Sequence, residues 1–191
     1  TGKYDRNRPF YNTVSPSMDI LISSNLERLL YLLSGGDDKL VAGYMKELSD
    51  TGCYQVSEEM RKKIQSVFVG GFSSEAETEA TIGKMMDEHK YLIDTHTAVA
   101  FHVLEQYRKE TGDQTKTVVA STASPFKFCD AVLDALNVTD KATGTALLDQ
   151  LAEVSGMPAP QPLATLKDKQ VRFTSWTEKE QMRAVVTDFL K

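Results

Sequence analysis

Apolar positions follow two different periods along this chain. Short apolar runs of the kind that form buried strands alternate with longer segments in which apolar residues recur every three or four positions, as on one face of a helix. Strands that alternate with helices are typical of βαβ units, in which parallel strands are covered by helices. The pattern therefore predicts an α/β fold with three layers and a mainly parallel sheet flanked by helices.

Four apolar runs predict the strands of this sheet. They lie at residues 19–22, 67–70, 91–93 and 117–120. Helices are expected to follow these runs and to fill the remaining gaps. The expected helices cover about residues 25–33, 57–66, 95–110, 142–154 and 178–190, and two more begin at Ser73 or Ser74 and at Pro125.

Local residue signals fix several of these element ends. Ser74 and Glu77 stand three residues apart in the pattern of a capping box. Asp94 or Thr95 is expected to cap the helix that follows. By contrast, the three prolines of residues 156–162 predict a rigid, extended segment that joins neither a helix nor a central strand.

The chain is expected to fold as one domain. Its 191 residues and 41% apolar content suit a single core that buries roughly 70% of the extended surface. No long linker, internal repeat or low-complexity tract interrupts the pattern. We therefore expect one α/β domain over residues 1–191, with an irregular leading segment at 1–14 and a C-terminal extension at 156–191 that includes the final helix.

Composition argues against several classes of protein. A net charge of −5 disfavours binding to nucleic acid. No apolar run approaches the roughly 20 residues needed to cross a bilayer, and the first residues do not resemble a secretory leader. Cys53 and Cys129 form no C-x-x-C pair that would indicate a disulfide framework or a zinc site. We expect a cytoplasmic protein with no nucleic-acid or membrane partner, and a first residue other than Met suggests a processed or excised piece.

Candidate chemistry is expected at the carboxyl ends of the predicted strands, where loops and helix N-termini present free backbone donors. The segment 121–128, STASPFKF, places small hydroxyl side chains at such an end, as a site for a planar polar ligand requires. Simple helix capping is the other interpretation of these residues. A metal site is not expected, because His96 and His102 lie about 240° apart around a helix.

Three long segments carry a resemblance to a known family. They are SPSMDILISSNLERLLYLLSG at residues 15–35, DTHTAVA at 94–100 and STASPFKF at 121–128. Strings of this length are far more specific than a short glycine motif. Together, and in this order, they closely resemble the C-terminal half of threonine synthase. The resemblance extends over nearly the whole chain and is weakest after about Gly156.

The resemblance implies part of the larger cofactor domain of a fold-type-II pyridoxal 5'-phosphate (PLP) enzyme. Members of this family convert O-phosphohomoserine and water to threonine and phosphate, with the cofactor between two α/β domains. In the family the hydroxyl at the second position of S-T-A meets the pyridine nitrogen, which implies Thr122 as a cofactor contact here, with Ser121 beside it. Asn25 and His96 are implied as substrate contacts, and helix capping remains the alternative for Asn25.

Several family features are missing or altered in this sequence. Many relatives have proline where this chain has Thr95 and histidine where it has Ser124, so no role is transferred to Ser124. The string H-G-P-T-x-A-F-K-D with the Schiff-base lysine and the G-N-F-G-N loop are absent, and Lys127 does not match that context. We therefore expect no catalytic residue in these 191 residues, and neither PLP binding nor activity from them alone.

The resemblance also implies two partners for the chain. They are the substrate O-phosphohomoserine and the N-terminal part of the same enzyme, whose absence is expected to expose an apolar surface and to favour a non-native dimer. Two other interpretations remain open. One is a non-enzymatic α/β module that binds a ligand or a partner protein. The other is a different fold-type-II lyase, such as a dehydratase of hydroxyamino acids, although the string SMDILISSNLERLL is unlike those enzymes.

Overall fold

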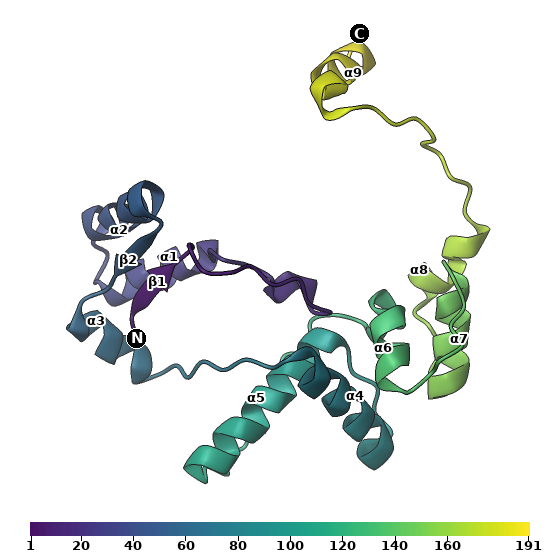
Figure 1. The fold of residues 1–191 in the computed structure, drawn as a ribbon, viewed down its shortest axis with the longest axis horizontal. Helices are drawn as coiled ribbons and strands as arrows, with labels where there is room; N and C mark the ends of the chain where they lie inside the picture. Colours follow the sequence, from purple (N-terminus) through teal and green to yellow (C-terminus); the bar gives the residue numbers. More distant parts are fainter.

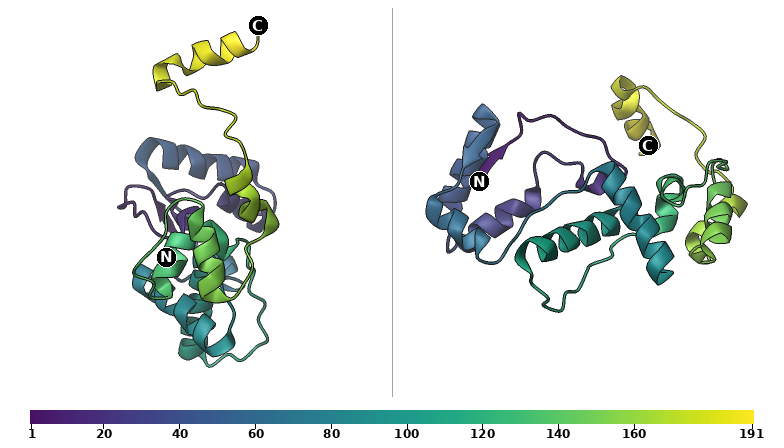
Figure 2. Two further views of the ribbon diagram at one scale, coloured as in Figure 1. Left: turned by 90° about the vertical axis from the view of Figure 1, so that its right-hand side faces the viewer. Right: turned by 60° about the horizontal axis from the view of Figure 1, so that its bottom comes forward.

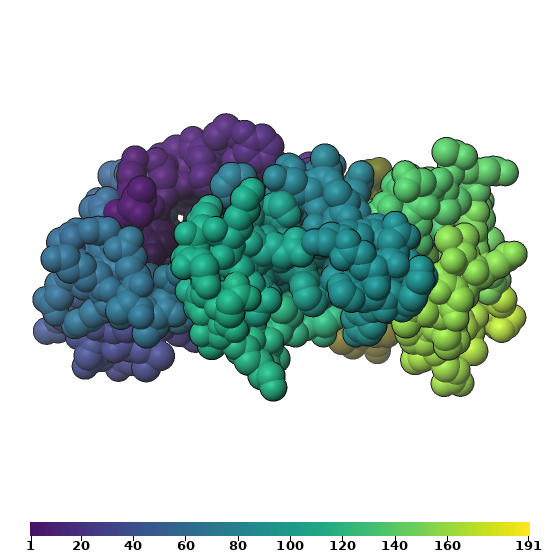
Figure 3. Space-filling model, turned by 90° about the horizontal axis from the view of Figure 1, so that it is seen from below, coloured from purple at the N-terminus to yellow at the C-terminus, as the bar shows by residue number.

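The computed structural model describes all 191 residues, and most of its regular structure is helical. Its elements succeed one another along an elongated molecule (Figure 1). Residues 1–6 and 24–66 gather at one end, residues 16–18 and 75–111 lie in the middle and residues 125–168 form the other end, while the last helix stands apart. The same order is visible from below in Figure 3, where the middle helices separate the two ends.

The N-terminal end combines a small antiparallel sheet with three helices. Strand β1 (Lys3–Asp5) pairs with β2 (Cys53–Gln55), and Tyr4 lies opposite Tyr54. The rings of Tyr4 and Tyr44 stack on Tyr54 at centroid distances of 4.9 and 5.2 Å. The helices are α1 (Ser24–Leu33), α2 (Asp38–Thr51) and α3 (Glu58–Gln65). Their buried core consists of Leu30, Tyr44, Leu48, Tyr54, Val56 and Met60.

The two middle helices begin at the predicted caps. α4 (Glu75–His89) follows Ser74, whose hydroxyl accepts the Glu77 N–H at 3.3 Å while the Glu77 carboxylate accepts the Ser74 N–H at 2.8 Å. α5 (Thr95–Thr111) follows Asp94, which caps it through its side chain. Both predicted caps are confirmed, because each signal depends only on residues within one helical turn.

Short helices form the other end of the molecule. A 3-10 turn at Pro125–Lys127 leads into α6 (Cys129–Ala135), and α7 (Ala146–Ser155) and α8 (Gln161–Ala164) follow. The larger core lies between these helices and the middle pair. It consists of Ile82, Leu92, Ile93, Ala98, Phe126, Cys129, Val132, Leu133, Ala135, Leu148 and Leu151.

The chain ends in a helix that does not touch the rest of the fold. α9 (Met182–Phe189) follows a 3-10 turn at Lys179–Gln181, and both lie beyond an irregular connection (Figures 1 and 2). The predicted final helix is thus confirmed. Its apolar side chains are exposed, with Phe189 at 86%. No helix in the chain combines the length and the apolar character that spanning a bilayer requires.

The predicted parallel sheet does not form within this chain. None of the four predicted strands has a ladder partner, and the one sheet is the antiparallel pair of β1 and β2. A helix satisfies its own backbone groups, whereas a strand needs a neighbouring strand. Side chains in three of the four runs are also uncovered, with Val118 91%, Val69 69% and Ile20 50% exposed, whereas Leu92 and Ile93 of the fourth are buried in the larger core. All four runs therefore lack strand neighbours in these residues, and three of them also lack a covering layer.

Two predicted segments are more regular than expected. The leading residues 1–14 contain β1, which is ordered by its pairing with β2 far along the chain. The proline segment 156–162 is extended only in part, because Pro162 stands in the first turn of α8. A proline in that position loses no helical hydrogen bond, since the first N–H groups of a helix have no partner.

Candidate functional site

Three segments that are far apart in the sequence meet at the N-terminus of α5. The backbone N–H of Ser17 donates to Nε2 of His96 at 3.1 Å, across 79 positions. The hydroxyl oxygen of Thr97 lies 3.0 Å from that of Ser121, across 24 positions. These contacts join the strings SPSMD, DTHT and STASPFKF. The three motif segments therefore form one structural site.

Asp94 is the centre of this junction. It is fully buried, and its carboxylate accepts the backbone N–H groups of His96 at 2.9 Å and Thr97 at 3.4 Å. The Thr97 hydroxyl also donates to Oδ2 of Asp94, and Nδ1 of His96 lies 3.1 Å from Oδ1. The N-terminus of α5 adds a favourable dipole for this negative charge. Every polar neighbour of the carboxylate is therefore a donor.

The contacts of His96 define its tautomer. Because Nε2 accepts from the Ser17 backbone, that nitrogen carries no proton, so Nδ1–H donates to Asp94. The ring is 7% exposed and lies against Phe128 at a centroid distance of 4.8 Å. Both nitrogens are thus used within the chain. His96 lies in the predicted crevice region and joins the site as a link between segments; its contact with a substrate stays a prediction.

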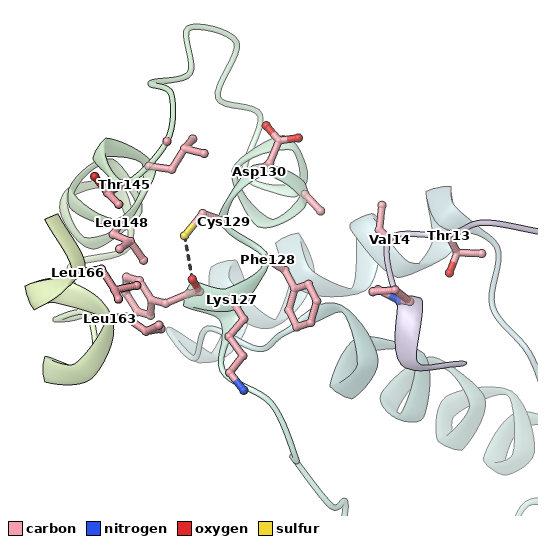
Figure 4. Close-up of a pocket in the computed structure, with 15 residues that line it drawn as sticks. Thr13, Val14, Lys127, Phe128, Cys129, Asp130, Thr145, Leu148, Leu163 and Leu166 are labelled. Carbon is pink, nitrogen blue, oxygen red and sulfur yellow. Dashed lines mark hydrogen bonds between the residues drawn. The ribbon is translucent and has the colours of Figure 1, made fainter. Parts of the chain in front are cut away.

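Ser121 and Thr122 are both exposed, but their hydroxyl groups differ. Ser121 is engaged with Thr97, whereas Thr122 makes no hydrogen bond within the chain. Thr122 is therefore free to serve a ligand. The neighbouring Lys127 is exposed on the 3-10 turn that precedes α6, and its side chain extends away from Cys129 and Thr145 (Figure 4).

Asn25 is not joined to this junction. It is exposed near the start of α1, and its side-chain oxygen accepts a hydrogen bond from Arg28 at 3.2 Å. No hydrogen bond links it to the other candidate residues, and it makes no cap contact. The structure thus brings together His96 and Ser121, leaves Thr122 open beside them, and places Asn25 on a separate element.

Two cavities flank the 3-10 helix at Pro16–Met18. One has a volume of about 590 Å³ and is lined mainly by apolar side chains, including Val14, Phe128 and Leu148 (Figure 4). The Cys129 thiol at its wall donates to the Phe126 carbonyl at 3.2 Å, and burial raises the pKa of this thiol. A buried thiol of this kind is unreactive.

The other cavity is more polar. Its volume is about 380 Å³, and it lies between the leading segment and the start of α4. Arg8, Asp19 and Glu75 contribute charged groups, while Ser15 and Ser73 contribute hydroxyl side chains. The chain contains no cluster of three or more side chains that could hold a metal ion. The site is thus built from hydroxyl groups, backbone donors and one buried carboxylate.

Sequence comparison identifies the relatives of this chain. The family model described as "Threonine synthase, C-terminal" matches residues 97–186, so the match begins inside the junction at α5. "Threonine synthase-like 1" of Macaca fascicularis is 35% identical over 160 residues, which cover 83% of this chain and 21% of that protein. "Threonine synthase" of Saccharomyces cerevisiae is 36% identical over 151 residues, which cover 72% of this chain and 29% of that protein.

A solved structure agrees along the full length of the chain. The PLP-bound threonine synthase of Brucella melitensis superposes with a TM-score of 0.78 at 33% identity, covering 100% of this chain and 36% of that chain. The chain belongs to the threonine synthase family and corresponds to the C-terminal portion of its members. The match also confirms the fold class at the level of the family, a fold-type-II α/β enzyme, although the parallel sheet is not completed within these residues.

The chain matches only part of each of these members of the threonine synthase family. The chain spans from 21% to 36% of the length of the three relatives above. Three residues of the site are not predicted from the sequence, namely Asp94 as a central acceptor, Thr97 and Ser17. The strings SPSMD and DTHT contain all three, but only the fold shows that these strings touch.

Proposed function

We propose that this chain supplies the C-terminal part of a threonine synthase, which uses PLP to convert O-phosphohomoserine and water to threonine and phosphate. The observation that carries the proposal is the junction of three family segments at the N-terminus of α5, which leaves the Thr122 hydroxyl open beside it.

The chemistry of Thr122 fits the ring nitrogen of PLP. A neutral hydroxyl can donate to an unprotonated pyridine nitrogen. Thr122 is exposed and has no competing hydrogen bond within the chain. When bound, PLP supplies an electron sink for the bonds of an amino-acid substrate. Thr122 would orient the ring, and one such bond contributes about 0.5–1.5 kcal/mol to cofactor binding.

The remaining parts of the site belong, in this proposal, to the N-terminal part of the same enzyme. These parts are the lysine that holds PLP and the glycine-rich loop for its phosphate. Apolar side chains left uncovered here, such as Val67 at 69% and Phe72 at 82%, support a large partner surface. We further propose that the 191 residues alone neither bind PLP nor turn over substrate, and that the enzyme works in the cytoplasm.

Phosphate release tests this proposal. The gene product that contains this chain is loaded with PLP and mixed with O-phosphohomoserine, and the 191 residues alone are assayed beside it. We expect threonine and phosphate in equal amounts from the first sample and neither from the second. A gene product that binds PLP or an amino acid without releasing phosphate would instead support the ligand-binding module.

A further inference from the structure

The segment that carries Thr122 is held by very few contacts. Residues 118–123 contain no helix or strand, and they make a single hydrogen bond, the contact of Ser121 with Thr97. The next anchors lie outside this stretch. Before it, Arg108 donates to the Thr115 carbonyl at 3.2 Å and to the Thr117 hydroxyl at 3.4 Å, and after it the Phe126 N–H donates to the Ser124 hydroxyl at 3.3 Å. The Thr97 contact is therefore the one polar anchor of this segment.

The direction of the hydrogen bond between Thr97 and Ser121 follows from the single proton on the Thr97 hydroxyl. Thr97 has one hydroxyl proton and two oxygen neighbours, Oδ2 of Asp94 and Oγ of Ser121. A hydrogen bond to a carboxylate is roughly twice as strong as one between neutral groups, so the proton of Thr97 goes to Asp94. The Thr97 oxygen is then an acceptor, and Ser121 donates its own proton to it.

Thr97, which anchors the segment, is itself held in place by burial and by hydrogen bonds. Thr97 is 2% exposed and lies in the first turn of α5, and Asp94 behind it is fully buried. Four donors hold Asp94, two of them from the α5 backbone. Ser121 is exposed and has no other partner in the chain. The buried pair thus sets the position of the exposed serine.

We propose that Thr97 is a positioning residue: with its hydroxyl proton held by Asp94, it fixes residues 121–122 through the Ser121 hydroxyl so that Thr122 meets its ligand. Naming PLP as that ligand rests on the proposed function. Ser121 then acts as the anchor of the segment rather than as a cofactor contact, because its single proton is directed at Thr97. Thr122 remains the residue that touches the ring.

Backbone ¹⁵N relaxation of the gene product that contains this chain tests the anchor without a cofactor. Thr97→Val keeps the shape of the side chain and removes its hydroxyl, whereas Thr97→Ser keeps the hydroxyl. We expect Thr97→Val to lower the backbone order parameters of residues 118–124 from the rigid range of about 0.85 to below about 0.6 while those of α7 stay unchanged, and Thr97→Ser to restore most of the order. The matched control is Thr81→Val, which removes a buried hydroxyl that donates to the Glu77 carbonyl at 2.7 Å.

Ser121→Ala removes the anchor from the exposed side, where the fold tolerates change. It should lower the order parameters of the same residues as Thr97→Val, and the double variant should show no further loss of order than either single variant, because both changes break one contact. Unchanged order parameters in Ser121→Ala, or a decrease spread evenly over the whole protein in Thr97→Val, would overturn the inference.

PLP binding separates the two proposals. In the loaded gene product, Thr97→Val should weaken PLP roughly twofold to tenfold and alter the circular dichroism of the bound cofactor, while Thr97→Ser and Thr81→Val leave both near the parent. If the parent does not bind PLP, the proposed function fails and the order parameters still decide the anchor. If the parent binds PLP and Thr97→Val alters neither the order parameters nor the cofactor signal, only the anchor is refuted.

Discussion

Asp94 has no contact with solvent, and all its polar neighbours are donors. The carboxylate caps α5, fixes the ring of His96 and directs the hydroxyl of Thr97. Removing it would leave two backbone N–H groups, an imidazole N–H and a hydroxyl without partners. Because buried donors that lose their acceptors are costly, this residue matters for stability as well as for the site.

We predict that Asp94→Ala lowers the free energy of unfolding by at least about 2 kcal/mol, since it removes a cap and leaves buried donors unpaired. Asp37→Ala is the matched control. Asp37 caps α2 from an exposed position with one hydrogen bond, to the Leu40 N–H at 2.9 Å, and its loss should cost about 1 kcal/mol. Urea unfolding of both variants checks the order, and equal losses would contradict the central role of Asp94.

The residues of the site are predictable from the sequence to different degrees. Thr122, Ser121 and His96 lie in recognisable strings, so their region is predictable. Both ring nitrogens of His96 are occupied by Ser17 and Asp94, and the Ser121 hydroxyl is hydrogen-bonded whereas that of Thr122 is free. These features depend on contacts across 79 and 24 positions. Such contacts cannot be derived from spacing along the chain.

At the scale of elements, the capping box of α4 connects stability to pH. Hydrogen bonds from the Ser74 hydroxyl and backbone N–H lower the pKa of Glu77 below its ordinary value of 4.5, and His102 adds a smaller attraction. The ionised carboxylate is therefore favoured in the folded state. Its contribution is complete above the unfolded pKa and disappears as the pH falls through the folded pKa.

We predict that Glu77→Gln makes α4 less sensitive to acid. The parent should lose stability relative to the variant as the pH falls from neutral to about 3, because only the parent must protonate a hydrogen-bonded carboxylate. Urea unfolding of both proteins across this range measures the difference. A difference that stays constant with pH would show that the ionised form of Glu77 is not favoured by folding.

Helices and strands differ in what the sequence predicts about them. The starts of α4 and α5 follow from residues within one turn, and so they are predicted correctly. α2 is not among the predicted helices, although Val41, Tyr44 and Leu48 recur at helical spacing. Predicted strands depend on neighbours from elsewhere, and the four apolar runs have none in this chain.

The whole molecule is elongated and leaves many large apolar side chains uncovered. Val118 is 91% exposed, Trp176 84% and Phe189 86%, and these residues lie in the middle connection, the C-terminal connection and α9. Surfaces of this kind mark contact areas. They agree with a chain that matches about a third of a solved threonine synthase and shares its fold over that part.

We predict that the 191 residues alone associate with one another as their concentration rises, because no other segment covers these side chains. Sedimentation should show the association weakening in a variant that combines Phe72→Ser, Val118→Thr and Phe189→Ser. A replacement of three exposed charged residues, Lys39→Ser, Lys46→Ser and Lys116→Ser, is the control and should leave it unchanged. A monomer at every concentration would contradict this prediction.

The contact of Thr122 with the cofactor is tested most directly by nitrogen NMR. The gene product that contains this chain is loaded with PLP labelled at the ring nitrogen, and its signal is compared with those of Thr122→Ser and Thr122→Val. We expect an unprotonated, hydrogen-bonded nitrogen in the parent and in Thr122→Ser, and a shift toward free pyridine in Thr122→Val. A protonated nitrogen in the parent, or one signal common to all three proteins, would contradict it.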